Sequence, residues 1–302
     1  MTARSDAAVD RQPPLRLRLA ARGLDITTLL VVPAAVVAVA LFIYPFLYGL
    51  WLSFNPAKAG GILANYIAFF SDPFLYDTIG TTLWLALPVT ILNLLVAIPV
   101  AFRVRRLRRQ RLLTTILVVP ITLGTVLVAQ GMLTYFGPQG WLNRVLLLFH
   151  VIPHPVRLIH NYTGVFISLF ITGFPFTFLL TLSYVTGIDP TLEQAAATLG
   201  ADARHRFWHV LLPLLVPGLA IVFCLSFVQA FSVFPSAVLL GAPAGPTRVI
   251  SIAAYQAAFE QYDYSMASAI AMIMGFVQLV IVAAILGLRG AFYRGPAAGG
   301  KG

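Results

Sequence analysis

The sequence predicts an all-α membrane protein with six transmembrane helices and with both chain ends in the cytoplasm. Of its 302 residues, 59% are hydrophobic and only 10% are charged, whereas about a quarter of the residues in a soluble domain are charged. Uncharged runs, each longer than the roughly 20 residues that a membrane-spanning helix needs, occur six times: 26–57, 78–102, 112–143, 158–188, 210–247 and 264–288. Runs of this length exclude the alternating segments of about ten residues that form a membrane β-barrel.

The basic residues are divided unequally between the two sides of the predicted helices. Sixteen of the twenty lie in the N-terminal segment and in the segments after the second, fourth and sixth helices, and only Lys58, Arg144, Arg157 and Arg248 lie on the other side. Cytoplasmic segments carry such an excess, so both termini are expected in the cytoplasm. The run "RVRRLRRQR" at 103–111 is therefore interpreted as a topology anchor near anionic headgroups rather than a nucleic-acid site.

The chain divides into a cytoplasmic tail at 1–25, a six-helix membrane domain at 26–288 and a second cytoplasmic tail at 289–302. The first helix is expected from about Asp25, which can cap it, to Phe54. Its apolar run is too long for the core of a signal peptide, so we expect the helix to be retained.

The remaining elements follow from apolar runs and the turn residues between them. Outer loops are expected at 55–77 and 137–160, the second with a short interfacial helix anchored by Trp141. A cytoplasmic loop is expected at 187–209. The other membrane helices are predicted at 78–102, 112–136, 161–186, 210–240 and 266–288.

Motifs for an enzyme, a cofactor or a metal are missing from the sequence. It has no GxxxxGK[ST] phosphate loop and no HExxH, CxxC or GxSxG motif, and Cys224 is the one cysteine. No Asp, Glu, Lys or Arg lies near the middle of a predicted span, which argues against a secondary carrier that titrates a buried carboxylate. We therefore expect no catalytic residue, cofactor or metal in this chain, and movement of the solute by another energy source.

One polar segment, "EQAAATLGADARHRFWHVLLP" at 193–213, separates two very apolar spans. Asp189 and Pro190 can begin a helix, with Thr191 and Gln194 as an alternative capping box. Gly200 can end this helix in the left-handed conformation, and Asp202 can cap a second one. The pattern predicts a helix–glycine–helix elbow with an alanine surface that another backbone can approach closely.

The segment resembles the cytoplasmic signature of binding-protein-dependent ABC importer permeases, E-A-A-x3-G-x9-I-x-L-P. Five of its seven named positions match; the seven positions fall on Gln194, Ala195, Ala196, Gly200, Val210, Leu212 and Pro213. The motif glutamate falls on Gln194, and Glu193 stands one position earlier, so a charge pair with the ATPase would require Glu193 to substitute. The stretches "LLVVPAAVVAVALFIYPFLYGLWLSF" and "AAFEQYDYSMASAIAMIM" resemble the same family, so the likeness covers most of 26–288.

The resemblance implies a fold like that of type I ABC importer permeases in a bacterial or archaeal inner membrane. It implies that Glu193 and the seven motif residues couple the chain to two cytoplasmic ATPase subunits, which bind ATP and Mg. It also implies a second permease subunit and an extracytoplasmic solute-binding protein that delivers the solute.

For the solute pathway we expect polar and aromatic side chains within the spans: Asn93, Gln130, Gln229, Phe231 and Ser232. Such polar residues also form ordinary hydrogen bonds between membrane helices. Uncharged spans favour a sugar or a polyol. The loop "ATLGA" at 197–201 resembles polyamine permeases instead, and Glu260 and Asp263 near the outer side could attract a cation. A passive channel, a secondary carrier and a membrane enzyme are the rival classes.

Overall fold

The computed structural model describes residues 26–57 and 60–292. The expected cap at Asp25, the tail at 1–25 and most of the tail at 289–302 lie outside these residues. The chain forms two compact units, residues 1–52 and residues 53–302, and each is described by itself. Among the described residues, six helices are long and apolar enough to cross a membrane, which confirms the predicted number of spans.

The first unit is an apolar helix with one widened turn. It comprises α2 (Ile26–Ala38), the π-helical segment η1 (Val39–Ile43) and α3 (Tyr44–Ser53), whose last residue belongs to the second unit. In the π turn the Tyr44 amide donates to the carbonyl of Val39, five residues earlier. Pro45 follows directly, and a proline ring disturbs the preceding turn in this way because it has no N–H group and crowds the carbonyl four residues before it.

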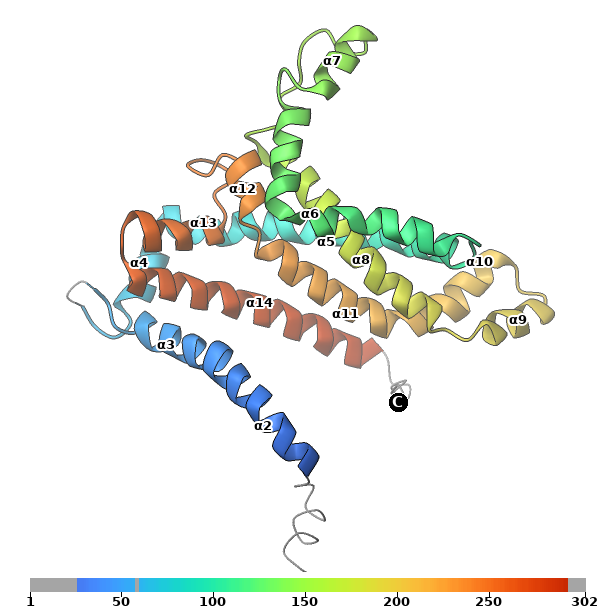
Figure 1. The fold of residues 1–302 in the computed structure, drawn as a ribbon, viewed down its shortest axis with the longest axis horizontal. Coiled ribbons are helices and arrows are strands. Elements are labelled where there is room, and N and C mark those ends of the chain that lie inside the picture. Colours follow the sequence, from blue (N-terminus) through green and yellow to red (C-terminus); the bar gives the residue numbers. More distant parts are fainter. Residues whose placement is uncertain (1–25, 58–59, 293–302) are drawn as a thin grey trace, which may run out of the picture. The chain divides into compact units, whose positions relative to one another are not determined.

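The second unit contains the other five spans and the short helices between them (Figure 1). The spans are α5 (Pro73–Arg105), α6 (Gln110–Phe136), α8 (Tyr162–Thr186), α10–η2–α11 and α14 (Tyr264–Phe292). The fourth of these spans runs continuously through α10 (Ala203–Arg206), η2 (Phe207–Leu211) and α11 (Leu212–Phe231). The short helices are α4 (Ala64–Ser71), α7 (Trp141–Leu148), α9 (Pro190–Thr198), α12 (Pro235–Leu240) and α13 (Ile250–Tyr255) followed by η3 (Gln256–Glu260).

The centre of this unit is formed by α5, α8 and α11, which all pack against one another. Ala97 and Ala101 of α5 are fully buried beside Phe178 of α8, in a cluster that also contains Leu215 of α11. Small side chains let membrane helices approach closely, where dispersion contacts accumulate. Buried threonines such as Thr90 satisfy their hydroxyls by donating to the carbonyl one turn earlier, so they do not open the core to water.

The expectation of one continuous helix at 210–240 is wrong. Helix α11 ends at Phe231, residues 232–234 are not helical, and α12 begins at Pro235. The cause is local, because a residue before proline is disfavoured in the helical region, and Phe234 has φ −133° and ψ −58°. A second break lies inside α6, where Gly124 has φ 75° and ψ 159°, a conformation that suits glycine.

The outer loops are more structured than their sequence suggested. The short helix expected around Trp141 is present as α7, and its buried Asn143 holds the loop through hydrogen bonds to Gly137 and Val156. Buried Arg248 joins two elements, since it donates to the Phe74 carbonyl at 2.7 Å and to Gln256 at 2.9 Å. Burial lowers the pKa of Arg248 from its usual value, and the negative charges of Asp72 and Glu260 partly offset this change by raising it.

Replacing Gly164 by Ala is expected to destabilise this unit by about 2 kcal/mol, measured as a lower midpoint of thermal unfolding in detergent. A Cβ atom at this position would lie 2.4 Å from the Leu158 carbonyl oxygen, which belongs to the backbone and cannot rotate away. The matched control is Gly131→Ala in α6, where a Cβ would meet no atom within 4 Å. Equal midpoints for the two variants would contradict this account of the packing.

Candidate functional site

The first arm of the predicted elbow is α9, and its sequence determines its start. The Asp189 carboxylate accepts a hydrogen bond from the Thr191 amide at 2.9 Å, and Pro190 occupies the first helical turn. The Asp189 cap is therefore the one that forms. Hydrogen bonds from the Thr191 backbone and side chain lower the pKa of Asp189, so the cap stays charged to a lower pH than an ordinary aspartate.

The end of α9 has the hydrogen bonds of a Schellman motif, the common termination around a left-handed residue. Gly200 has φ 85°. Its amide donates to the Ala197 carbonyl at 3.0 Å, and the next amide, of Ala201, donates to the Ala196 carbonyl at 3.1 Å. Glycine reaches this conformation without the strain that a Cβ atom causes. Gly200 is thus the point at which the chain reverses between the two arms.

The second arm continues without interruption into the membrane. The Asp202 carboxylate accepts from the His205 amide at 2.8 Å and caps α10. From Ala203 the helix passes through the π turn η2 into α11 and ends at Phe231. A force on α10 therefore acts along one rod that reaches from the elbow into the core of the bundle.

An ion pair attaches the first arm to the end of α5. Glu193 receives hydrogen bonds from Arg105, at 2.9 Å, and from Arg106. The side chains of Arg105 and Glu193 are only 14% and 15% exposed, so water screens this pair less than an ordinary surface pair. Arg105 also donates to the Val185 carbonyl at the end of α8, at 3.0 Å. We call Glu193, Arg105 and Arg106 the tether.

The second arm rests on the same end of α5. The rings of Phe102 and Phe207 are 5.4 Å apart with an angle of 75° between their planes, an edge-to-face geometry that aromatic pairs favour. Because Phe102 precedes Arg105 by one turn, the end of α5 contacts both arms. The elbow is therefore fixed to the bundle at two points on one helix.

The outer surface of α9 exposes apolar side chains. Leu192, Ala195 and Leu199 are exposed, and their spacing of three and four residues places them on one face. Leu199 is 88% exposed, which is unfavourable for a leucine in water. Glu193 and Ala196 face the bundle and are partly buried, whereas Gln194 is exposed. This apolar face, Leu192–Ala195–Leu199, is suited to contact with another protein.

The remaining predicted coupling residues lie where the second arm enters the bundle. Val210 and Leu212 are partly buried, and Leu212 packs against the cluster that contains Ala97 and Phe178. Pro213 is exposed in the first turn of α11. These three residues therefore lie in or beside the second arm, away from the apolar face of α9.

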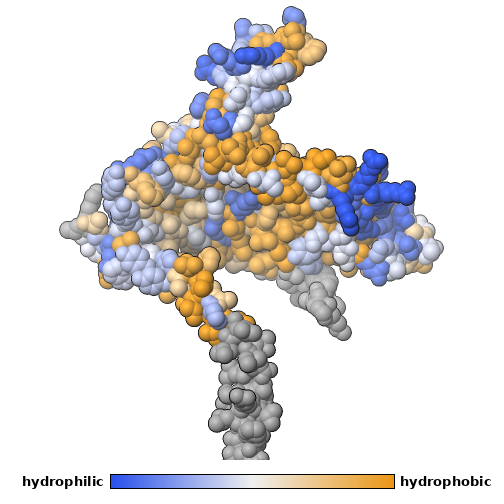
Figure 2. Space-filling model, viewed as in Figure 1, coloured by the Kyte–Doolittle hydropathy of each residue, from blue (hydrophilic) through white to orange (hydrophobic). Residues whose placement is uncertain are grey.

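Figure 2 shows hydrophilic side chains concentrated at the end of the bundle where α10 lies, beside a hydrophobic band over the spans. The arginines of 103–111, Arg204 and Arg206 belong to this end of the chain. Among the described residues, no group of three or more His, Cys, Asp and Glu side chains could hold a metal ion. The surface at this end is therefore basic in character.

The predicted pathway residues do not all lie together. Asn93, Gln229 and Ser232 line one cavity of about 140 Å³. Gln130 is exposed on α6 and is not part of this lining. Phe231 is fully buried in the hydrophobic core, with its ring 5.4 Å from that of Phe227. Within the described chain, Phe231 therefore packs the core rather than the cavity.

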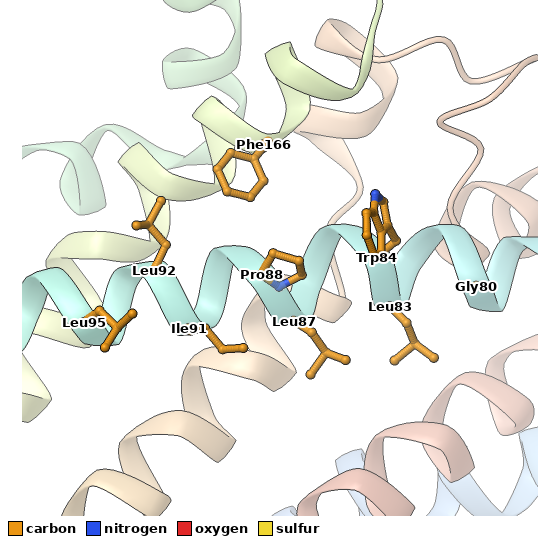
Figure 3. A pocket seen from close by; sticks show the side chains of 9 residues that line it. All are labelled: Gly80, Leu83, Trp84, Leu87, Pro88, Ile91, Leu92, Leu95 and Phe166. Carbon is orange, nitrogen blue, oxygen red and sulfur yellow. The ribbon is translucent and has the colours of Figure 1, made fainter.

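A larger hollow of about 600 Å³ lies along α5, bounded by Trp84, Leu87, Ile91, Leu95 and by Phe166 of α8 (Figure 3). Its lining side chains are apolar except for the indole N–H of Trp84, so it offers a polar solute very little hydrogen bonding. A hydrocarbon chain or an apolar helix suits this surface.

The sequence analysis missed two features of the site, the arginines of the tether and the place of Thr125 in the cavity. The arginines of the tether lie 88 and 87 residues from Glu193 and were interpreted only as a topology anchor. Thr125, which lines the cavity with Asn93, follows the glycine break of α6. That "LGT" sequence in mid-span was the available signal, because glycine within a helix weakens it.

Comparison with known families gives one match over residues 93–295, to the family "Binding-protein-dependent transport system inner membrane component". Among curated relatives, a probable sulfate transport system permease protein, cysT, of Prototheca wickerhamii is 29% identical over 70% of this chain and 82% of its own length. The spermidine/putrescine transport system permease protein PotB of Haemophilus influenzae is 30% identical over 59% of this chain and 63% of its own length.

Among solved structures, a bacterial ABC transporter involved in the import of the acidic polysaccharide alginate has a chain of the same fold. The TM-score is 0.77, with 21% identity over 91% of this chain and 98% of that chain. The same fold is found in a bacterial alginate ABC transporter in complex with alginate pentasaccharide-bound periplasmic protein, with a TM-score of 0.78 and 21% identity over 93% of this chain and 98% of that chain.

Proposed function

Since this chain belongs to the family of binding-protein-dependent transport system inner membrane components and is a multi-pass permease subunit of an ABC importer, we propose that its elbow couples ATP hydrolysis to solute movement. In this proposal α9 docks on a cytoplasmic ATPase subunit through its apolar face. The observation that carries the proposal is the contrast between the two sides of α9, one exposed and apolar and the other tethered to α5.

The geometry supports transmission of a rigid-body movement. A pull on α9 acts on α5 through Glu193, and on α11 through the continuous rod that begins after Gly200. Because α5 and α11 pack against α8 as well, displacement of the elbow moves three spans together. Coupling requires two states that differ in such contacts. The predicted coupling residues thus divide into a docking part, Gln194 and Ala195, and an anchoring part, Ala196, Val210, Leu212 and Pro213.

Glu193 has a different role from the one that the motif alone suggested. The tether occupies both of its carboxylate oxygens within the chain. We therefore assign Glu193 to the attachment of α9, and we assign the contact with the ATPase to Leu192, Ala195 and Leu199. Exposed Gln194, at the position of the motif glutamate, can add a hydrogen bond to that contact.

The partners follow from the family. Two ATPase subunits would bind ATP and Mg, and an extracytoplasmic solute-binding protein would deliver the solute to the outer loops. A second permease subunit, a related chain or a copy of this one, would complete the pathway. We place the assembly in a bacterial or archaeal inner membrane, with the elbow and both termini on the cytoplasmic side.

For the solute, uncharged lining favours a small hydroxylated molecule, a sugar or a polyol. Among the described residues that line the cavity, none is Asp, Glu, Lys or Arg. A charged solute there would lose its hydration without gaining a partner of opposite charge.

Polyamines are the second candidate, because PotB relatives are named for spermidine and putrescine. The two carboxylates expected to attract a cation are engaged in the structure: Asp263 accepts from the Met266 amide at 2.9 Å, and Glu260 interacts with the charge of Arg248. Sulfate, named for other relatives, is a third solute to test.

The decisive experiment reconstitutes this chain with its ATPase, its companion membrane subunit and its solute-binding protein in nanodiscs. ATP hydrolysis is measured with the binding protein empty and loaded with a polyol, spermidine or sulfate. Stimulation by one loaded form supports an importer and identifies the solute class. If no ATPase co-purifies, and this chain in closed liposomes lets solute cross the membrane down its gradient, the protein is a passive channel.

The apolar face gives a sharper test of docking. Leu199→Asp is expected to reduce co-purification of the ATPase at least tenfold, because it places a charge in an interface that would otherwise exclude water. Leu148→Asp in α7 is the control, since Leu148 is also highly exposed, at 73%, but lies in a predicted outer loop. Equal loss in both variants would show a general defect of folding rather than of docking.

A further inference from the structure

The small cavity lies where two membrane spans are broken. Thr125 directly follows the break at Gly124 in α6, and Ser232, Phe234 and Pro235 form the break between α11 and α12. Irregular backbone at membrane depth is tolerated where it is buried in protein or lines a cavity. Broken spans are also a general way in which transporters form solute sites. Both breaks therefore converge on one place.

Asn93 is the polar centre of this cavity. It lies in the interior of α5 and is only 2% exposed. Its side-chain carbonyl oxygen Oδ1 is buried and has no hydrogen-bond partner, one of two such atoms in the described chain. An unsatisfied buried acceptor is unfavourable, so a ligand that donates a hydrogen bond to it would relieve this cost.

The surrounding structure holds Asn93 in place. A Cβ atom on Gly173 of α8 would lie 2.8 Å from the amide nitrogen Nδ2 of Asn93, so a side chain at position 173 would displace the Asn93 amide. Several hydroxyls of the lining are also fixed: Ser226 pairs with Thr177 and Ser236 with Ser168, each at 2.8 Å. The lining is therefore ordered, and the Oδ1 atom of Asn93 still lacks a hydrogen-bond donor.

From these observations we infer that the cavity is a solute-binding site and that Asn93 determines its specificity by accepting a hydrogen bond from the solute. The inference rests on the proposed importer function and narrows its substrate class to solutes that carry donor groups. Hydroxyls of a polyol and ammonium groups of a polyamine both supply this chemistry. Sulfate has only acceptor oxygens, so it leaves Oδ1 unpaired.

The test uses the complete complex in proteoliposomes and measures solute transported per ATP hydrolysed, with sorbitol, spermidine and sulfate in separate arms. Asn93→Leu, which removes the acceptor, is expected to lower this ratio at least tenfold. Gly173→Ala, which displaces the same side chain without changing its chemistry, is expected to act in the same direction. The matched control is Thr90→Val, one turn earlier on α5, which is buried but donates to its own helix and should change the ratio less than twofold.

Asn93→Asp distinguishes the two donor sources, because an ammonium group compensates the charge of a buried carboxylate, whereas a neutral hydroxyl leaves most of its desolvation cost uncompensated. Transport of spermidine is expected to rise at least threefold in this variant if the natural solute is a polyamine. If the natural solute is a polyol, transport of sorbitol by this variant is expected to fall. Unchanged ratios in all Asn93 variants, or sulfate as the transported solute, would overturn the inference while leaving the importer function intact. A wild-type complex that no loaded binding protein stimulates would overturn both.

Discussion

Reversing the charge of Glu193, by Glu193→Arg, is expected to lower the ATP hydrolysis that the loaded binding protein stimulates by at least tenfold. The variant places three cationic side chains together at the end of α5. In the wild-type chain, the side chains of Arg105 and Glu193 are largely buried at this position. Loss of a partly buried pair costs about 2 kcal/mol, between the values of exposed and of buried pairs. Without the tether, movement of α9 no longer draws α5 with it.

The charge-swapped double variant separates this role from simple damage. Glu193→Arg combined with Arg105→Glu re-forms one ion pair, and we expect it to recover at least a third of the stimulated rate. Arg108→Glu is the control for the loss of a basic residue from the same run, since Arg108 is exposed, and it should retain most activity. If the double variant is as inactive as Glu193→Arg alone, the tether does not carry the coupling.

Replacing Gly200 by Val is expected to decouple the two arms, with at least a tenfold loss of stimulated hydrolysis. A side chain there would meet no atom within 4 Å, so crowding by neighbours does not explain the loss. The backbone does: φ is 85°, and an L-residue in the left-handed region costs about 1–2 kcal/mol, more when it is β-branched. The Schellman hydrogen bonds then fail and the angle between α9 and α10 changes.

Gly200→Asn is the matched control for this position. Asparagine enters the left-handed region more readily than other side chains, and the surrounding space is open. We expect this variant to keep at least half of the wild-type stimulation. Loss of activity with Asn as severe as with Val would mean that the position needs the absence of a side chain, as in a close contact with the ATPase, rather than a special backbone conformation.

The parts that could be predicted from sequence are those that depend on neighbouring residues. Uncharged runs of sufficient length specify the spans, and Asp189, Gly200 and Asp202 specify the elbow, because each acts on backbone groups within five residues. The break at Phe234 also has a local cause in Pro235, but a single apolar run obscured it. Composition alone does not show whether a proline begins a helix or interrupts one.

The rest depends on contacts between distant segments. Nothing near Glu193 indicates that its carboxylate meets arginines of α5, and Asn93 and Gln130 look alike in the sequence although one is buried in a cavity and the other is exposed. The role of Phe231 is equally ambiguous in the sequence, because an aromatic side chain at a helix end can pack a core or line a pathway. Only the arrangement of α5, α8 and α11 separates these cases.

The widened turn η2 has a consequence for how this chain can vary in length. A π turn accommodates one more residue than an α turn, so deletion of a single codon within 207–211 would leave a continuous helix. Because the shortened turn closes in the α form, α10 and everything before it keep nearly their present rotation relative to α11, whereas a deletion within the α-helical residues 212–231 would rotate them by about 100°. Natural changes of length in this rod should therefore occur at 207–211, whereas residues 212–231 should vary only by exchange of one residue for another.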